Sequence, residues 1–213
     1  MAVRGAQTGE REPTARGSGS RTGNGGRRAQ LLELAIDLFA RHGYEAVGVD
    51  DIGAAAGVSG PALYRHFSGK PALLVAAYEH VWERMRDELD QALAEHTDPT
   101  ATLSALVDSW VAIAAEDRAL IAVYVREERG LPEHDRRRLR RYQRGYIAAW
   151  SRQLRALRPE LDEQEADAAV RCAIAAINSV AFYEGGLPEP RLSAMLREAA
   201  WAVLTQAASG SGA

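Results

Sequence analysis

The stretch that decides the fold is VDDIGAAAGVSGPALYRHF, residues 49–67. Two short runs of helical character, Val49–Ala56 and Pro61–Phe67, flank the turn Gly57-Val58-Ser59. Glycine allows a left-handed turn, serine is a preferred residue at a helix N-terminus, and proline is tolerated in the first helical turn. We therefore predict a helix-turn-helix unit.

The second short helix, expected over Gly60–Phe67, has two different faces. Leu63 and Phe67 lie four residues apart and are expected to point inward. Before it, Ala54–Ala56 are expected to allow close helix crossing, and the Ser59 hydroxyl to accept a backbone N–H. The outward side chains suit phosphates and base edges, and they are Pro61, Ala62, Tyr64, Arg65 and His66.

Outside this unit the apolar residues also follow a helical period. Further helices are expected over residues 31–42, 71–95, 98–116, 119–129, 133–157, 161–183 and 190–206. The helix 71–95 is expected to bury one face, formed by Leu74, Tyr78, Val81, Met85, Leu89 and Leu93. No alternating β pattern or fixed repeat is present. The prediction is an all-α fold, with an N-terminal three-helix unit and a C-terminal helical bundle.

Composition and charge refine this division. The 213 residues have a formal net charge of −3, are 46% hydrophobic and contain one cysteine, Cys172, which we expect to be packed on an apolar helix. The charge is uneven: +4 over residues 1–28, −2 over 29–74 and −5 over 75–213. We expect a flexible basic arm (1–26), a helix-turn-helix domain (27–74), a second domain (75–207) and a flexible tail (208–213). No segment resembles a signal peptide or a membrane span, so a cytoplasmic protein is expected.

The run from Leu31 to Leu74 resembles the DNA-binding domain of the tetracycline-repressor (TetR/AcrR) family. The resemblance is carried by Leu38-Phe39, Gly43-Tyr44, Asp51-Ile52, Ala56-Gly57-Val58-Ser59, Leu63-Tyr64-Arg65-His66-Phe67 and Lys70. Two positions depart from the pattern: Val47-Gly48 stands where hydroxyl residues are frequent, and Pro61 where glycine is common.

The resemblance implies a ligand-responsive regulator of transcription, most often a repressor, that binds a palindromic double-stranded DNA operator as a homodimer. It implies phosphate contacts from Tyr64, His66 and Lys70, and base contacts from the first turn of the recognition helix. The expected DNA-binding set is Arg27, Arg28, Gly48, Val49, Ser59, Gly60, Pro61, Ala62, Tyr64, Arg65, His66 and Lys70. Tyr64→Ala and Lys70→Ala are expected to weaken DNA binding with little change in melting temperature.

The larger domain is expected to bind a small hydrophobic or aromatic effector, with acyl-CoA-like molecules among the candidates. The expected pocket residues, each of which could instead be core, are Trp110, Tyr124, Tyr146, Trp150, Asn178 and Tyr183. Small residues in the last two helices would allow a dimer interface, and they are Ala173, Ala175, Ala176, Ser179, Ala194, Ala199 and Ala200. The resemblance further implies that ligand binding tilts the helix 71–95 and changes the spacing of the recognition helices.

An arginine cluster at residues 136–144 has three open interpretations. On a helix whose buried stripe runs through Leu139, Tyr142, Tyr146, Trp150, Leu154 and Leu157, these arginines occupy the opposite face. They could form a solvated face with a Glu133–Arg137 pair, bind an anionic ligand or make a second contact with nucleic acid.

An enzyme is the main competing class, and the sequence argues against it. The five histidines form no metal pair at helical spacing, and no nucleophile elbow or phosphate-binding loop is present. We therefore predict no catalytic residues, no metal and no cofactor. The alternatives kept open are an all-α ligand-binding protein or enzyme without specific DNA binding, and a ligand-sensing relative that has lost it.

Overall fold

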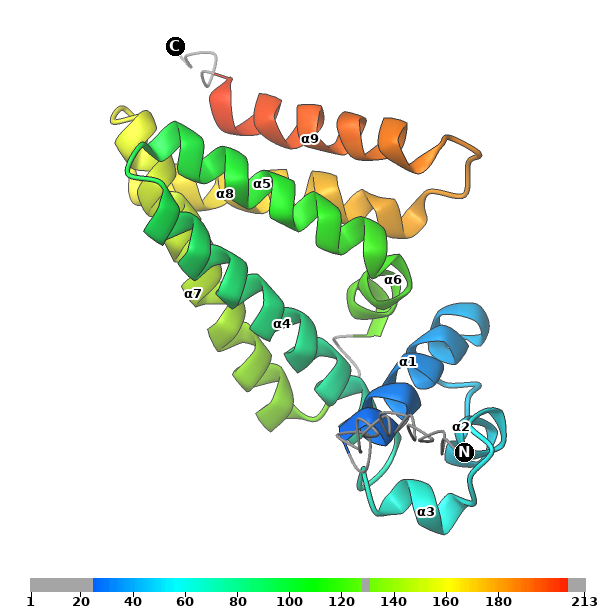
Figure 1. Ribbon diagram of the computed structural model, residues 1–213. Coiled ribbons are helices and arrows are strands. Elements are labelled where there is room, and N and C mark those ends of the chain that lie inside the picture. The colour runs from blue at the N-terminus through cyan, green and yellow to red at the C-terminus, as the bar shows by residue number, and fades with distance from the viewer. Residues whose placement is uncertain (1–24, 128–130, 207–213) are drawn as a thin grey trace, which may run out of the picture.

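The computed structural model describes residues 25–127 and 131–206, and it shows a small helical head beneath a larger helical body (Figure 1). Over these residues no strand occurs, so the all-α prediction is confirmed there. The predicted tail, 208–213, lies outside the described residues. So does the predicted arm except at its end, because α1 (Gly25–His42) already includes residues 25 and 26.

The head consists of α1, α2 (Val49–Ala55) and α3 (Gly60–Tyr64) around a small apolar centre. Leu31, Ile52 and Leu63, one from each helix, are fully buried there. Gly43 ends α1 at φ +81°, and Gly57 turns the chain at φ +64°, both in the left-handed region that glycine tolerates. The predicted helix-turn-helix is confirmed.

The close approach in this motif occurs at Gly53, not at the alanines. Ala54 and Ala55 are exposed, so they do not form the helix crossing that we expected of them. Gly53 is buried, and a β-carbon placed on it would lie 3.0 Å from the carbonyl oxygen of Val58. Glycine is therefore required at 53 for the turn to fold back onto α2.

The recognition helix α3 is shorter than predicted. It ends at Tyr64, while Leu63 and Phe67 are both buried as expected. Ser59 is its N-cap, but the hydroxyl makes no capping hydrogen bond, which corrects that prediction. Instead the Ser59 carbonyl accepts the N–H groups of Ala62 and Leu63 at 2.9 and 3.2 Å.

The body contains α4 to α9, and the predicted helices are confirmed with small shifts at their ends. Leu93 and Tyr142, expected on buried stripes, are exposed. The expected helix over 161–183 divides into an α-helix and a 3₁₀ turn, because the chain tightens at Ser179. The elements are α4 (Lys70–Glu95), α5 (Pro99–Glu116), α6 (Arg118–Glu127), α7 (Glu133–Leu157), α8 (Glu163–Asn178), η2 (Ser179–Phe182) and α9 (Glu189–Thr205).

Helix α4 runs from the head up into the body (Figure 1) and is held there by three ion pairs. Arg84 donates at 2.7 Å to both Glu116 and Asp117, at the junction of α5 and α6. Closer to the head, Glu79 pairs at 2.8 Å with Arg138 of α7. Any movement of α4 relative to the body must therefore stretch or exchange these contacts.

Candidate nucleic-acid interface and ligand cavity

The outer face of α3 is open to solvent. Tyr64 is 56% exposed, and Ser59, Pro61 and Arg65 are also exposed, while Gly60, Ala62 and His66 are half-buried. No hydrogen bond or ion pair within the described residues engages Tyr64 or Arg65. The face expected to contact DNA therefore carries unengaged hydrogen-bonding groups, while the opposite side of α3 is buried in the head.

Lys70, the first residue of α4, is already engaged within the protein. Its ammonium donates to the carbonyl oxygens of Tyr44 at 2.7 Å and Glu45 at 3.4 Å. It also lies 4.2 Å from the centre of the Tyr44 ring, a cation–π distance. Burial, Glu45 and Glu127 raise the pKa of Tyr44 to about 12, so the phenol stays neutral. Lys70 thus joins α4 to the loop after α1.

The two arginines in the first turn of α1 also have internal partners. Arg27 donates to the carbonyl of Ala56 at 2.8 Å, at the C-terminus of α2, and to Gln30 at 2.6 Å. The guanidinium of Arg28 lies 4.8 Å from the centre of the Phe67 ring, and the side chain is exposed. Arg28 keeps its charge open to solvent, whereas Arg27 acts as a clamp on α2.

The N-terminus of α2, where Gly48 and Val49 were expected to contact DNA, is approached by carboxylates. The Gly48 N–H donates to Asp51 at 2.7 Å, so that donor is taken. A β-carbon on Gly60 would lie 3.0 Å from a carboxylate oxygen of Asp50, which therefore sits beside the start of α3. Sequence reasoning missed both acidic roles, although acidic residues in the first turn of a helix are a recognised signal. Val49 is half-buried at this site.

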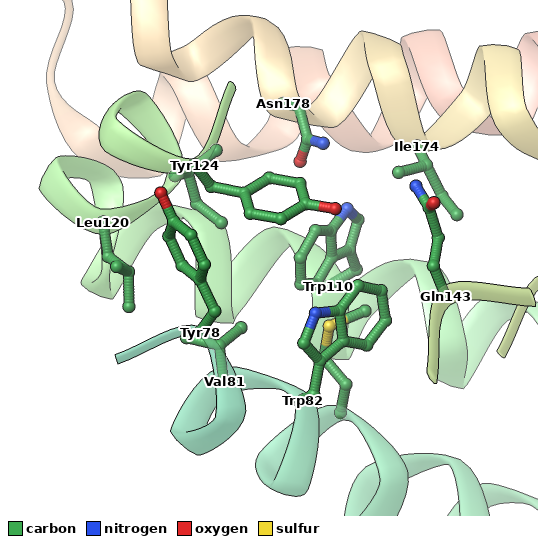
Figure 2. A pocket seen from close by; sticks show the side chains of 11 residues that line it. Tyr78, Val81, Trp82, Trp110, Leu120, Tyr124, Gln143, Ile174 and Asn178 are labelled. Carbon is green, nitrogen blue, oxygen red and sulfur yellow. The ribbon is translucent and has the colours of Figure 1, made fainter. Parts of the chain in front are cut away.

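A mostly apolar cavity lies in the body between α4, α5, α6, α7 and α8 (Figure 2). Its free space is about 460 Å³ including the open mouth, and most of it is too narrow for the centre of a water molecule. None of the described residues that line it is charged. The lining is Tyr78, Val81, Trp82, Met85, Trp110, Leu120, Ile121, Tyr124, Gln143, Ile174 and Asn178.

Three of the six predicted pocket residues line this cavity: Trp110, Tyr124 and Asn178. The other three predictions do not fit it. Trp150 is fully buried core, and Tyr146 faces a second groove between α4 and α7, where burial raises its pKa. Tyr183 stacks under Arg118 and accepts the N–H of Leu187 at 2.9 Å.

Gln143, Tyr78 and Trp82 were missed as cavity residues. Gln143 precedes Tyr146 by three positions and follows Leu139 by four, so the helical period could have placed this amide on the inward face. Tyr78 lies on the predicted buried stripe of α4, where an aromatic residue cannot be distinguished from ordinary core by spacing alone.

Family models match both parts of the chain. The model for bacterial regulatory proteins of the tetR family matches residues 31–77, and that for the tetracyclin repressor-like C-terminal domain matches residues 96–182. Together they cover well over half of the sequence, in the order of the head and the body. The chain belongs to the TetR family.

Individual TetR relatives agree with this assignment. The chain is 39% identical over 106 residues to the transcriptional activator FasR of Mycolicibacterium smegmatis, covering 48% of this chain and 47% of FasR. It is 35% identical over 116 residues to the transcriptional repressor KstR2 of Rhodococcus jostii, covering 54% and 56%. The chain thus spans about half the length of these curated relatives. A TetR-family regulator from Bordetella parapertussis superimposes with a TM-score of 0.74 at 25% identity, covering 84% of this chain and 94% of that one.

The outer face of the last two helices of this TetR chain is partly apolar. Ala176, Leu192, Met195 and Ala199 line a groove on it, and Arg171, Arg191 and Glu198 are also exposed on these helices. Of the small residues predicted to form an interface, Ala175, Ser179 and Ala199 are exposed, whereas Ala173 and Ala200 are buried between helices of the same chain. Three large apolar side chains are also exposed around this face: Phe182, Leu187 and Met195. Cys172 lies exposed on α8, which contradicts its predicted burial.

The arginine cluster of α7 does not form one solvated face. Arg136 and Arg137 both pair with Glu133, which lowers the pKa of that carboxyl, and the predicted Glu133–Arg137 pair is confirmed at 3.2 Å. Arg138 is half-buried and bridges Glu79 and Asp135, so it turns toward α4. Arg141 lines the groove between α4 and α7.

Among the residues that the structure describes, no group of three or more metal-ligating side chains comes together. Within the same residues, no helix is both long enough and apolar enough to traverse a lipid bilayer.

Proposed function

We propose that this chain is a ligand-responsive regulator of transcription that binds a palindromic DNA operator as a homodimer in the cytoplasm. We propose that the chain represses transcription and is released from its operator when a small hydrophobic or aromatic effector binds. Acyl-CoA-like molecules are included among these effectors. The match to tetR-family regulators and the names of the two relatives, an activator and a repressor, support a regulator.

The observation that best supports the proposal is that helices lining the cavity also contact the head. Two elements that line the cavity, α4 and α6, are also the body elements that contact α1 of the head. A ligand that favours one arrangement of α4 and α6 therefore also favours one position of the helix-turn-helix. Such coupling requires only that the ligand bind the two arrangements with different affinity.

Operator binding requires a specific distance between two recognition helices. In a two-fold dimer the two α3 helices must reach major grooves about 34 Å apart, one turn of DNA. The partly apolar outer face of α8 and α9 is the surface proposed for that dimer. It lies at the far end of the body from α3 (Figure 1), so small rotations at the interface become large displacements at the head.

The described head, residues 27–74, contains five basic and five acidic side chains and is neutral overall. Affinity must then come from placed contacts on α3 and from dimer geometry, more than from bulk charge. Non-specific binding should accordingly be weak and specific binding should have a modest salt dependence.

The test is selection of DNA from a random library by the purified full-length protein, followed by anisotropy titrations of the recovered site from 50 to 300 mM salt. We expect a palindromic sequence, bound by two chains. Recovery of no sequence above background would overturn the proposal.

A second candidate is a ligand-binding helical protein that does not bind DNA specifically. The departure at Val47-Gly48 favours it, because no hydroxyl stands there to contact a phosphate and the Gly48 N–H already donates to Asp51. The Asp51→Asn variant in the same titration separates the candidates. It should tighten operator binding in a DNA-binding protein and leave a protein without that activity unchanged.

A further inference from the structure

The cavity in the body has two polar groups whose hydrogen-bonding capacity is unused. The indole N–H of Trp110 is buried, with the residue 4% exposed, and it has no hydrogen-bond partner among the described residues. The buried amide oxygen of Asn178 likewise has none there. Figure 2 shows the Trp110 ring from α5 and the Asn178 amide from α8, with the hydroxyl end of Tyr124 between them in this view.

Leaving such buried groups unpaired destabilises a protein. A ligand that satisfies both would recover that free energy on binding. The pair consists of one donor and one acceptor, so the complementary ligand group must accept one hydrogen bond and donate another. A neutral hydroxyl does both with a single oxygen atom.

The walls of the cavity limit the charge of the ligand. Every described residue that lines it is uncharged, and most are aromatic or aliphatic. An ionised carboxylate in this space would lose its hydration without gaining a cation, and its oxygens would face the Asn178 carbonyl oxygen as acceptor against acceptor. An ammonium group would lack a carboxylate partner in the same way.

We propose that the cavity binds an uncharged, ring-containing alcohol or phenol, with its hydroxyl between Trp110 and Asn178. This inference rests on the proposed function in one respect, that the cavity is the effector site. Tyr78, Trp82 and Tyr124 supply aromatic surface for the rings of the ligand. Gln143, from α7, also lines the cavity.

The experiment uses four probes that share one ring system: naphthalene, 2-methoxynaphthalene, 2-naphthol and 2-naphthoate. Binding to the full-length protein without DNA is followed at pH 7 by quenching of tryptophan fluorescence and by thermal shift. 2-Naphthol should bind about tenfold more tightly than 2-methoxynaphthalene, which accepts but cannot donate, and 2-naphthoate should bind more weakly than naphthalene.

Two variants assign the effect to the named groups. Asn178→Leu should abolish the difference between 2-naphthol and 2-methoxynaphthalene, and Trp110→Phe should weaken the binding of 2-naphthol and of 2-methoxynaphthalene by about three- to tenfold. In both variants the affinity for naphthalene should fall by less than the affinity for 2-naphthol. Gln91→Leu, which removes an exposed amide outside the cavity, is the control.

The proposal is overturned if 2-methoxynaphthalene or 2-naphthoate binds as tightly as 2-naphthol, if no probe binds, or if folded variants keep the wild-type preference. Should a variant not fold, the comparison of probes on the wild-type protein still decides. Because binding is measured without DNA, failure here is distinct from failure of operator binding.

Discussion

The ammonium of Lys70 lies 2.7 Å from the carbonyl oxygen of Tyr44 and 4.2 Å from the centre of its ring, so one side chain joins the start of α4 to the loop after α1. A lysine in this position can serve two purposes. It can fix the angle between head and body in the free protein, and it can offer its remaining N–H to a DNA phosphate, since an ammonium has three donors.

Lys70→Met should therefore lower both stability and DNA affinity. This differs from the expectation drawn from the sequence, which was little change in melting temperature. Loss of the carbonyl contacts and of the cation–π contact should cost about 1 kcal/mol. Loss of a phosphate contact should reduce the salt slope of binding by about one. Urea denaturation and anisotropy at several salt concentrations measure the two effects, and an unchanged unfolding free energy would contradict the structural role.

Tyr64→Ala should weaken DNA binding without changing stability. Tyr64 is exposed, and among the described residues it has no hydrogen bond to lose. A lost hydrogen bond to phosphate corresponds to about 1.5–3 kcal/mol, or at least about tenfold in affinity. The matched control is Tyr142→Ala, an exposed tyrosine on α7. Equal operator affinity in the two variants would remove Tyr64 from the interface.

The helix-turn-helix could be predicted because its signals are local. Gly57 and Ser59 determine a turn within a few residues, whatever the rest of the chain does. The role of Gly53 could not be predicted in this way, because it depends on where the Val58 carbonyl lies after the turn has formed. The same limit applies to Lys70, whose partner Tyr44 is 26 positions earlier.

The cavity was predictable only in part, for a related reason. Trp110, Tyr146 and Trp150 all lie on apolar stripes, and helical periodicity shows that such residues face inward. It does not show which of them meet a gap between helices. That depends on how α4, α6 and α8 are spaced, which is a property of the packed bundle.

Gly53→Ala should destabilise the head, in spite of the higher helix propensity of alanine. The added β-carbon would lie 3.0 Å from the Val58 carbonyl oxygen, so the turn must shift. We expect a loss of about 1–3 kcal/mol in the free energy of unfolding. Gly145→Ala on α7 is the control, because nothing lies within 4 Å of the new β-carbon, and it should stabilise by up to about 1 kcal/mol. Equal changes by denaturant titration would refute the steric argument.

Arg158→Met should loosen the C-terminal end of α9. Arg158 is buried and donates to the carbonyl oxygens of Leu204 at 3.3 Å and Gln206 at 2.6 Å, while its Nε pairs with Glu160. Charge-assisted hydrogen bonds of this kind contribute about 1.5–3 kcal/mol. The control is Arg155→Met, which removes an exposed arginine from the last turn of α7, three residues before Arg158. It should change the melting temperature little. Hydrogen exchange of the α9 amides should rise in the first variant alone.

Met195→Glu should convert the proposed dimer into a folded monomer. Met195 is 46% exposed on the partly apolar face of α8 and α9, so a charge there costs nothing in the monomer but is desolvated at an interface. Operator affinity should fall by at least about a hundredfold, since a monomer holds only one half-site. Leu93→Glu, at an equally apolar exposed position on α4 that is 38% exposed, should keep wild-type assembly. Sedimentation velocity measures the assembly, and a Met195→Glu protein that still sediments as a dimer would place the interface on another face.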